Sequence, residues 1–126
     1  MSANQEKLER LHAQLRYEVG PGIRAALEDP TVTGIKVGED GKLWLKKHVV
    51  RWQDTGEIVA ADQRLRALNT MASLLGKTIN ERSPQLSGEL PLTGDRVEGS
   101  VFPSSTEASF VIRLHAGKIF TLVDYV

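Results

Sequence analysis

The sequence contains no cysteine, which excludes a disulfide framework, thiolate catalysis and cysteine-based metal binding. It also lacks an excess of charge of either sign, because 16 basic residues balance 16 acidic ones. Dedicated nucleic-acid binders usually carry a clear basic excess, so direct binding of DNA or RNA is not expected. These absences favour a binding, assembly or regulatory role that depends on a few well-placed residues.

Long apolar runs are missing as well. The first twenty residues lack the basic and apolar regions of a signal peptide, and no run approaches the roughly 20 apolar residues that span a bilayer. A chain of 126 residues with 40% hydrophobic residues is typical of one globular domain with one core. We therefore expect a single cytoplasmic domain over residues 1–126.

Apolar spacing and turn residues predict nine elements in the order α-α-β-β-β-α-β-β-β. Helices are expected at 4–19, 23–28 and 61–75, and strands at 32–37, 42–47, 48–52, 86–90, 96–102 and 109–115. The last predicted helix would bury Leu65, Leu68, Ala72 and Leu75. This order predicts an α+β domain, PAS-like, with helices packed on one face of an antiparallel sheet of about six strands.

The end of the chain contains a pattern typical of a helix start. Thr121 and Asp124 have the spacing of a capping box. The pattern has two interpretations: a frayed terminal turn, or the first turn of a further element of a longer protein.

Several motifs that resemble active sites fail on closer inspection. Gly76-Lys77-Thr78 ends like a phosphate-binding P-loop, but Met71 occupies the position of the earlier glycine, and the run ends a helix rather than opening one. Three separated histidines lack the spacing of a helical zinc site. Three neighbouring carboxylates are expected to face solvent rather than to catalyse: Glu89, Asp95 and Glu98.

A mildly basic hairpin has two interpretations. Its cations are Lys36, Lys42, Lys46, Lys47 and Arg51. Lysines on edge strands commonly prevent aggregation, which is the favoured interpretation. Contact with an anionic surface is the alternative.

Three segments carry a family resemblance. They are LRYEVGPGIRAALEDPTVTGIKVGEDGKLWLKK, PQLSGELPLTGDRVEGSVFP and SFVIRLHAGKIFTLVDYV, and together they cover most of residues 15–126. In these segments the chain resembles the N-terminal domain of the VirB/Trb family of secretion ATPases. The runs GELPLTGDRVEG and FTLVDYV are the most specific.

The resemblance implies a non-catalytic part of a larger machine. Family members continue into a RecA-like domain that carries the P-loop and binds ATP and Mg²⁺, and that domain is absent after residue 126. The implied protein is a homo-hexameric ring, peripheral at the cytoplasmic face of the bacterial inner membrane, which powers type IV secretion or conjugation. Its partners would be its own C-terminal ATPase domain, neighbouring subunits and other secretion-apparatus proteins. This chain alone should lack ATPase activity, and it should hold no bound cofactor because its affinity for nucleotide should be very weak.

Two other functions remain open at this point. One is the N-terminal domain of a type II secretion or type IV pilus ATPase. The other is a free-standing PAS-like module that binds a small ligand or a partner. A P-loop encoded beyond residue 126 would favour an ATPase, and a stop codon would favour the free-standing module.

Arg96 and Arg113 are the candidate site residues. If Val101 pairs with Phe110 in a hairpin, the two arginines lie on the face opposite the apolar residues, and Glu98 faces Arg113. From the residues alone, Glu98 and Arg113 form an exposed ion pair and Arg96 is solvated. The family resemblance instead implies that both arginines reach the phosphates of a nucleotide, as phosphate sensors or arginine fingers.

Overall fold

The computed structural model describes residues 3–48 and 50–115 and contains three helices and six strands in the predicted order. The elements are α1 (Ala3–Glu18), α2 (Gly20–Glu28), β1 (Val32–Val37), β2 (Lys42–Lys47), β3 (Gln53–Ile58), α3 (Ala61–Leu74), β4 (Gln85–Glu89), β5 (Arg96–Ser100) and β6 (Ser109–Arg113). The predicted α+β class is confirmed. The expected capping box at Thr121 lies outside the described residues.

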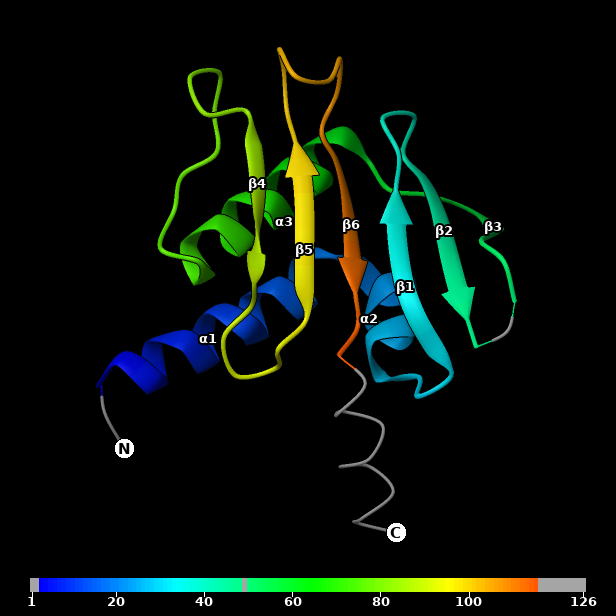
Figure 1. Cartoon of the computed structure of the whole chain (residues 1–126), viewed down its shortest axis with the longest axis horizontal. Coiled ribbons are helices and arrows are strands. Elements are labelled where there is room, and N and C mark those ends of the chain that lie inside the picture. The colour runs from blue at the N-terminus through cyan, green and yellow to red at the C-terminus, as the bar shows by residue number, and fades with distance from the viewer. Residues whose placement is uncertain (1–2, 49, 116–126) are drawn as a thin grey trace, which may run out of the picture.

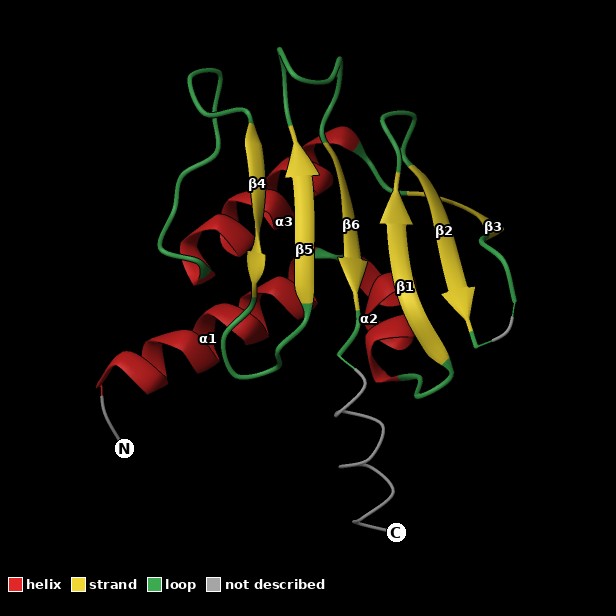
Figure 2. Cartoon of the chain, viewed as in Figure 1, coloured by secondary structure: helices red, strands yellow, loops and turns green. Residues whose placement is uncertain are grey.

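The six strands form one antiparallel sheet in the order β3-β2-β1-β6-β5-β4. Two three-stranded units, β1 to β3 and β4 to β6, are joined by the pairing of β1 with β6 (Figure 1). All three helices lie behind the sheet in Figure 2, so no helix of residues 3–48 and 50–115 covers its front face. The layout is a two-layer α+β domain with one free sheet face.

The core lies between the helices and the covered face of the sheet. Among its fully buried side chains are Ile35, Phe110 and Ile112 from the sheet and Leu68 and Met71 from α3. Close approach of α3 depends on glycine, because a Cβ at Gly99 in β5 would collide with the side chain of Leu68. The strand residues that alternate with these core positions therefore point to the free face.

Buried Arg64 ties α3 to both strands at the centre of the sheet. Its side chain is 5% exposed, and its Nη1 donates hydrogen bonds to the carbonyls of Gly38 (3.1 Å), Glu39 (2.8 Å) and Ala108 (2.7 Å). The Glu39 carboxylate accepts a further hydrogen bond from the backbone N–H of Thr106 (2.6 Å). These bonds hold the end of β1 against the start of β6.

Two of the expected elements begin several residues away from their predicted starts. The strand expected at 48–52 is wrong: a turn follows β2, where the Val50 N–H bonds the Lys47 carbonyl, and β3 begins at Gln53 and contains the expected turn at Gly56. The second helix begins at Gly20 rather than at Ile23. Pro21 fits its first turn because the N–H that proline lacks has no partner there.

The expected buried stripe of α3 is correct at Leu68 and Ala72, and Leu75 is partly buried, but the stripe is wrong at Leu65. Leu65 is 44% exposed, whereas Arg64, Ala67, Leu68 and Met71 are buried. The spacing of apolar residues along α3 predicted no charged residue on its buried side. Arg64 lies there because its side chain donates hydrogen bonds to three carbonyl groups.

Replacing Arg64 with leucine should lower the free energy of unfolding by about 2–3 kcal/mol, because it leaves buried carbonyls without their charged donor. Arg64→Lys should recover part of this loss. Urea unfolding followed by circular dichroism measures both. Arg66→Ala is the control, since Arg66 makes only an exposed ion pair with Asp62 and its loss should cost less than about 0.5 kcal/mol. Equal losses for Arg64→Leu and Arg66→Ala would contradict this role.

Candidate functional site

The register of the free face brings the two candidate arginines directly opposite each other. Arg96 in β5 pairs with Arg113 in β6, and both side chains are exposed. Facing residues of an antiparallel pair lie about 4.5–5.5 Å apart, which places two positive charges side by side. Within residues 3–48 and 50–115, neither guanidinium forms an ion pair.

The expected register was wrong by two residues. Phe110 faces Gly99 rather than Val101, because the chain leaves β5 after Ser100, and the Val101 N–H bonds the Pro84 carbonyl beside β4. A shift by an even number keeps each side chain on its expected face. It does change the partners, so the expected pair of Glu98 with Arg113 is wrong, and Glu98 faces Val111.

The arginine pair belongs to a row that crosses the free face of the sheet. Reading from β2 to β4, the row is Lys46, Gly34, Arg113, Arg96 and Glu89. Three of its four charged side chains are positive. Like charges directly opposite each other destabilise a sheet, so this row costs stability unless an anion joins it.

Buried Asp95 fixes the end of the strands that carry the arginines. Its side chain is 3% exposed, and its Oδ1 accepts a hydrogen bond from the backbone N–H of His115 at 2.8 Å. The bond joins the residue before Arg96 to the segment after Arg113. The expectation that Asp95 faces solvent is therefore wrong, whereas Glu89 and Glu98 are exposed as expected.

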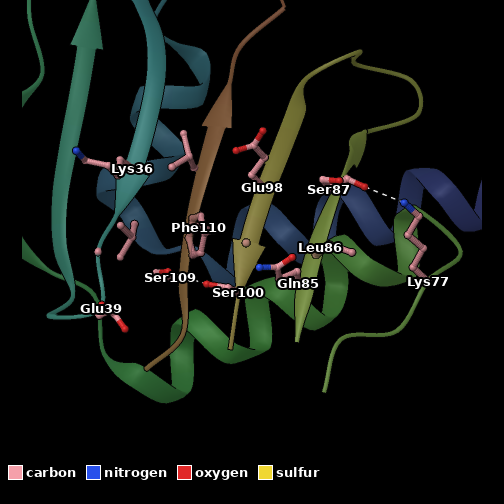
Figure 3. A pocket seen from close by; sticks show the side chains of 14 residues that line it. Lys36, Glu39, Lys77, Gln85, Leu86, Ser87, Glu98, Ser100, Ser109 and Phe110 are labelled. Atoms are coloured by element: carbon pink, nitrogen blue, oxygen red, sulfur yellow. Dashed lines mark hydrogen bonds between the residues drawn. The ribbon is translucent and has the colours of Figure 1, made fainter. Parts of the chain in front are cut away.

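A shallow depression of about 760 Å³ lies on the free face next to the arginine row. Figure 3 shows its lining side chains from β1, β6, β5 and β4, with Lys77 donating a hydrogen bond to the Ser87 carbonyl at 2.8 Å. Glu98, Ser100 and Ser109 also line it. Polar and apolar groups contribute about equally to its lining, which suits a ligand or protein surface that combines hydrogen bonds with apolar contacts.

An aromatic cluster on the same face was not expected from the sequence. The Lys36 ammonium lies 5.3 Å from the ring centre of Trp44 and 5.0 Å from that of Trp52. The alternation of Trp44 with Leu43 and Leu45 indicated its face, which it shares with the neighbouring lysines of β2. No signal placed Trp52 there, because it follows the strand rather than belonging to it.

The run that ends like a P-loop lies at the end of α3, as expected. Gly76 has a φ of +67°, and the Lys77 N–H bonds the Ala72 carbonyl at 2.8 Å, which is the pattern of a glycine helix terminus. The described residues contain no group of three metal-ligating side chains, and no helix among them is long and apolar enough to cross a membrane.

Known relatives match the chain over nearly its whole length. It is 33% identical over 117 residues to a probable conjugal transfer protein TrbB of Sinorhizobium fredii, and 31% identical over 117 residues to a conjugal transfer protein TrbB of Rhizobium radiobacter. The chain is a homologue of the TrbB conjugal transfer proteins. The match covers 93% of this chain but 36% of each TrbB, so the chain spans about a third of the length of these relatives.

The fold also agrees with a solved structure. The VirB11 ATPase from the Brucella suis type IV secretion system, in complex with sulphate, matches 95% of this chain and 37% of its own chain with a TM-score of 0.72. At 18% identity this likeness shows the fold. No family model matches the chain. The resemblance to the VirB/Trb family is thus confirmed by TrbB relatives in sequence and by VirB11 in fold.

Replacing Arg113 with glutamine should raise the free energy of unfolding by about 0.2–1 kcal/mol at low salt, because it removes the repulsion between facing arginines. The gain should shrink at high salt, where exposed charges are screened. Arg96→Gln is the matched variant, and its gain should be smaller since it also removes the attraction to Glu89. Thermal or urea unfolding at two salt concentrations measures both. A loss of stability in Arg113→Gln at low salt would show that the pair is not strained.

Proposed function

We propose that this chain is the N-terminal, ring-forming and nucleotide-gating domain of a hexameric ATPase that powers type IV secretion or conjugative plasmid transfer. The observation that carries the proposal is the facing pair of Arg96 and Arg113 on the free sheet face. Similarity to TrbB and the shared fold with VirB11 support the assignment to a secretion ATPase.

The arginine pair suits the phosphates of ATP. A guanidinium stays charged and binds phosphate oxygens through two parallel N–H donors, so two facing guanidinium groups offer a fork to each side of one phosphate chain. Binding the phosphates would relieve the repulsion between Arg96 and Arg113. The pair would therefore favour the conformation in which this domain contacts nucleotide, which is the gating step.

The chemistry of hydrolysis belongs to the other domain of the proposed protein. ATP and Mg²⁺ would be held by the C-terminal ATPase domain, where Mg²⁺ neutralises charge on the transferring phosphoryl group. Arg96 and Arg113 would reach the same phosphates from this domain as sensors or arginine fingers. An arginine in that role is worth about 10³–10⁵ in rate in well-studied phosphoryl transferases.

The proposed protein would assemble through this domain. Its partners would be neighbouring subunits, its own ATPase domain and other secretion-apparatus proteins, and its place the cytoplasmic side of the bacterial inner membrane. Lys36, Lys46, Lys47 and Arg51 give the β1–β3 end of the domain a basic surface that suits anionic lipid headgroups.

A second function is favoured by a different observation. The open depression of about 760 Å³ beside the arginine row would suit a small ligand or partner in a free-standing PAS-like module. The same fold would also serve a type II secretion or type IV pilus ATPase. The similarity to TrbB favours conjugation over these alternatives.

In the full-length ATPase, Arg96→Ala or Arg113→Ala should lower ATP hydrolysis by tenfold or more, because each removes a charge that stabilises the transferring phosphoryl group. Phosphate release by the purified protein measures this. Circular dichroism of the 126-residue chain should remain unchanged, since both side chains are exposed.

Arg66→Ala in α3 is the matched control, because it removes an exposed arginine from the opposite layer and should leave hydrolysis unchanged. The 126-residue chain alone should release no phosphate from ATP. Normal turnover in both arginine variants would assign Arg96 and Arg113 to a solvated surface instead.

A further inference from the structure

Trp52 lies on the free face of the sheet over a glycine in β1. A Cβ built on Gly34 would lie 2.8 Å from Cη2 of Trp52, closer than real Cβ atoms approach, so the ring occupies the space that any other side chain would fill. Gly34 faces Arg113 in the neighbouring strand. The ring of Trp52 therefore lies beside the arginine pair, and it can lie there because Gly34 has no side chain.

Cations surround this aromatic ring. Lys36 lies 5.0 Å from its centre, and an open hollow of about 450 Å³ is lined by Trp52, Lys46, Val50 and Arg51. Trp52 is partly exposed, and Arg51 and Val50 are exposed. An accessible indole bordered by positive charge is the combination that binds a flat aromatic group attached to an anion.

The spacing along the row suits a single nucleotide. Neighbouring strands lie about 4.8 Å apart, so Arg113 and Arg96 are about 5 Å and 10 Å from the strand on which Trp52 rests. A nucleotide presents its base and its phosphates in the same linear order, separated by the ribose. The row of Trp52, Arg113 and Arg96 matches that order.

We propose that Trp52 is the stacking platform for the base of the nucleoside triphosphate whose phosphates contact Arg96 and Arg113. This inference rests on the proposed function and adds to it a base-recognition residue. Stacking on an aromatic ring tolerates different bases, so the site favours nucleotides over bare phosphate chains without selecting one base.

A mononucleotide suits the face better than the other anionic ligands. Single-stranded nucleic acid needs a continuous track of cations and rings, whereas Glu89 follows Arg96 in the row and Glu98 lies on the same face. An anionic membrane would attract Lys46 and Arg51 but has no group to stack on Trp52. Both ligands are included as outcomes of the test.

The test compares ATP with tripolyphosphate, which has the phosphate chain without the base. Binding to the 126-residue chain is measured by calorimetry and by tryptophan fluorescence, which reports on this face because Trp44 and Trp52 are the two tryptophans of the chain. We expect ATP to bind roughly tenfold more tightly than tripolyphosphate, as one base stack would provide. In Trp44→Phe, where Trp52 is the remaining tryptophan, ATP should quench the emission.

Two variants separate the base contact from the phosphate contact. Trp52→Leu should weaken ATP binding to the level of tripolyphosphate and leave tripolyphosphate binding unchanged, and Trp52→Phe should retain part of the preference for ATP. Arg96→Ala should weaken both ligands. Should tripolyphosphate binding withstand Arg96→Ala and Arg113→Ala, the proposed function fails, whatever Trp52 does.

Three results would overturn the role of Trp52 by itself. The first is equal affinity of the wild-type chain for ATP and tripolyphosphate, whereas binding of neither would contradict the phosphate contact of Arg96 and Arg113 as well. The second is tighter binding of a twelve-nucleotide oligothymidylate than of ATP, which would assign the face to single-stranded nucleic acid. The third is a shift of Trp52 emission with phosphatidylserine vesicles but not with ATP, which would assign it to a membrane.

Discussion

The pairing of β1 with β6 is the contact on which the rest of the structure depends. It joins residues about 75 positions apart in sequence, such as Lys36 and Val111, and turns two three-stranded units into one sheet. Hydrogen bonds close both ends of this seam. Arg64 holds the carbonyls of Gly38 and Ala108 at one end, and the Leu114 N–H donates to the Thr33 carbonyl at the other. Without the seam, the arginine pair would not continue across the sheet to Gly34 and Lys46.

Because the helices cover one face of the sheet, the residues of the other face are released from packing. The core positions of β5 and β6, such as Val97, Phe110 and Ile112, account for the burial of these strands. The residues between them need only be compatible with a strand. Two facing arginines are compatible with a strand, although their repulsion lowers the stability of the sheet. A residue that lowers stability without making a stabilising contact is typical of a binding site.

The sequence predicted the elements and the faces better than it predicted partners. Period-two alternation assigns Val97 and Arg96 to opposite faces whatever the register, so the face of each arginine was predictable. Their pairing was not, because it depends on where the chain leaves β5, and the Val101 bond to Pro84 lies outside any local pattern. Arg64 and Trp52 escaped prediction for a related reason. Arg64 is positioned by carbonyl groups that are distant in sequence, and Trp52 is positioned by Gly34 in β1.

The position of the proposed ligand follows from the same seam. Trp52 and Gly34 belong to the first three-stranded unit, whereas Arg96 and Arg113 belong to the second. A nucleotide whose base stacks on Trp52 and whose phosphates contact the arginines would cross the boundary between β1 and β6. A ligand that binds only the joined sheet stabilises that joining by mass action. Bound nucleotide would then strengthen the contact between β1 and β6, while its phosphates relieve the repulsion between Arg96 in β5 and Arg113 in β6. Together these two effects give the domain a physical means of sensing nucleotide.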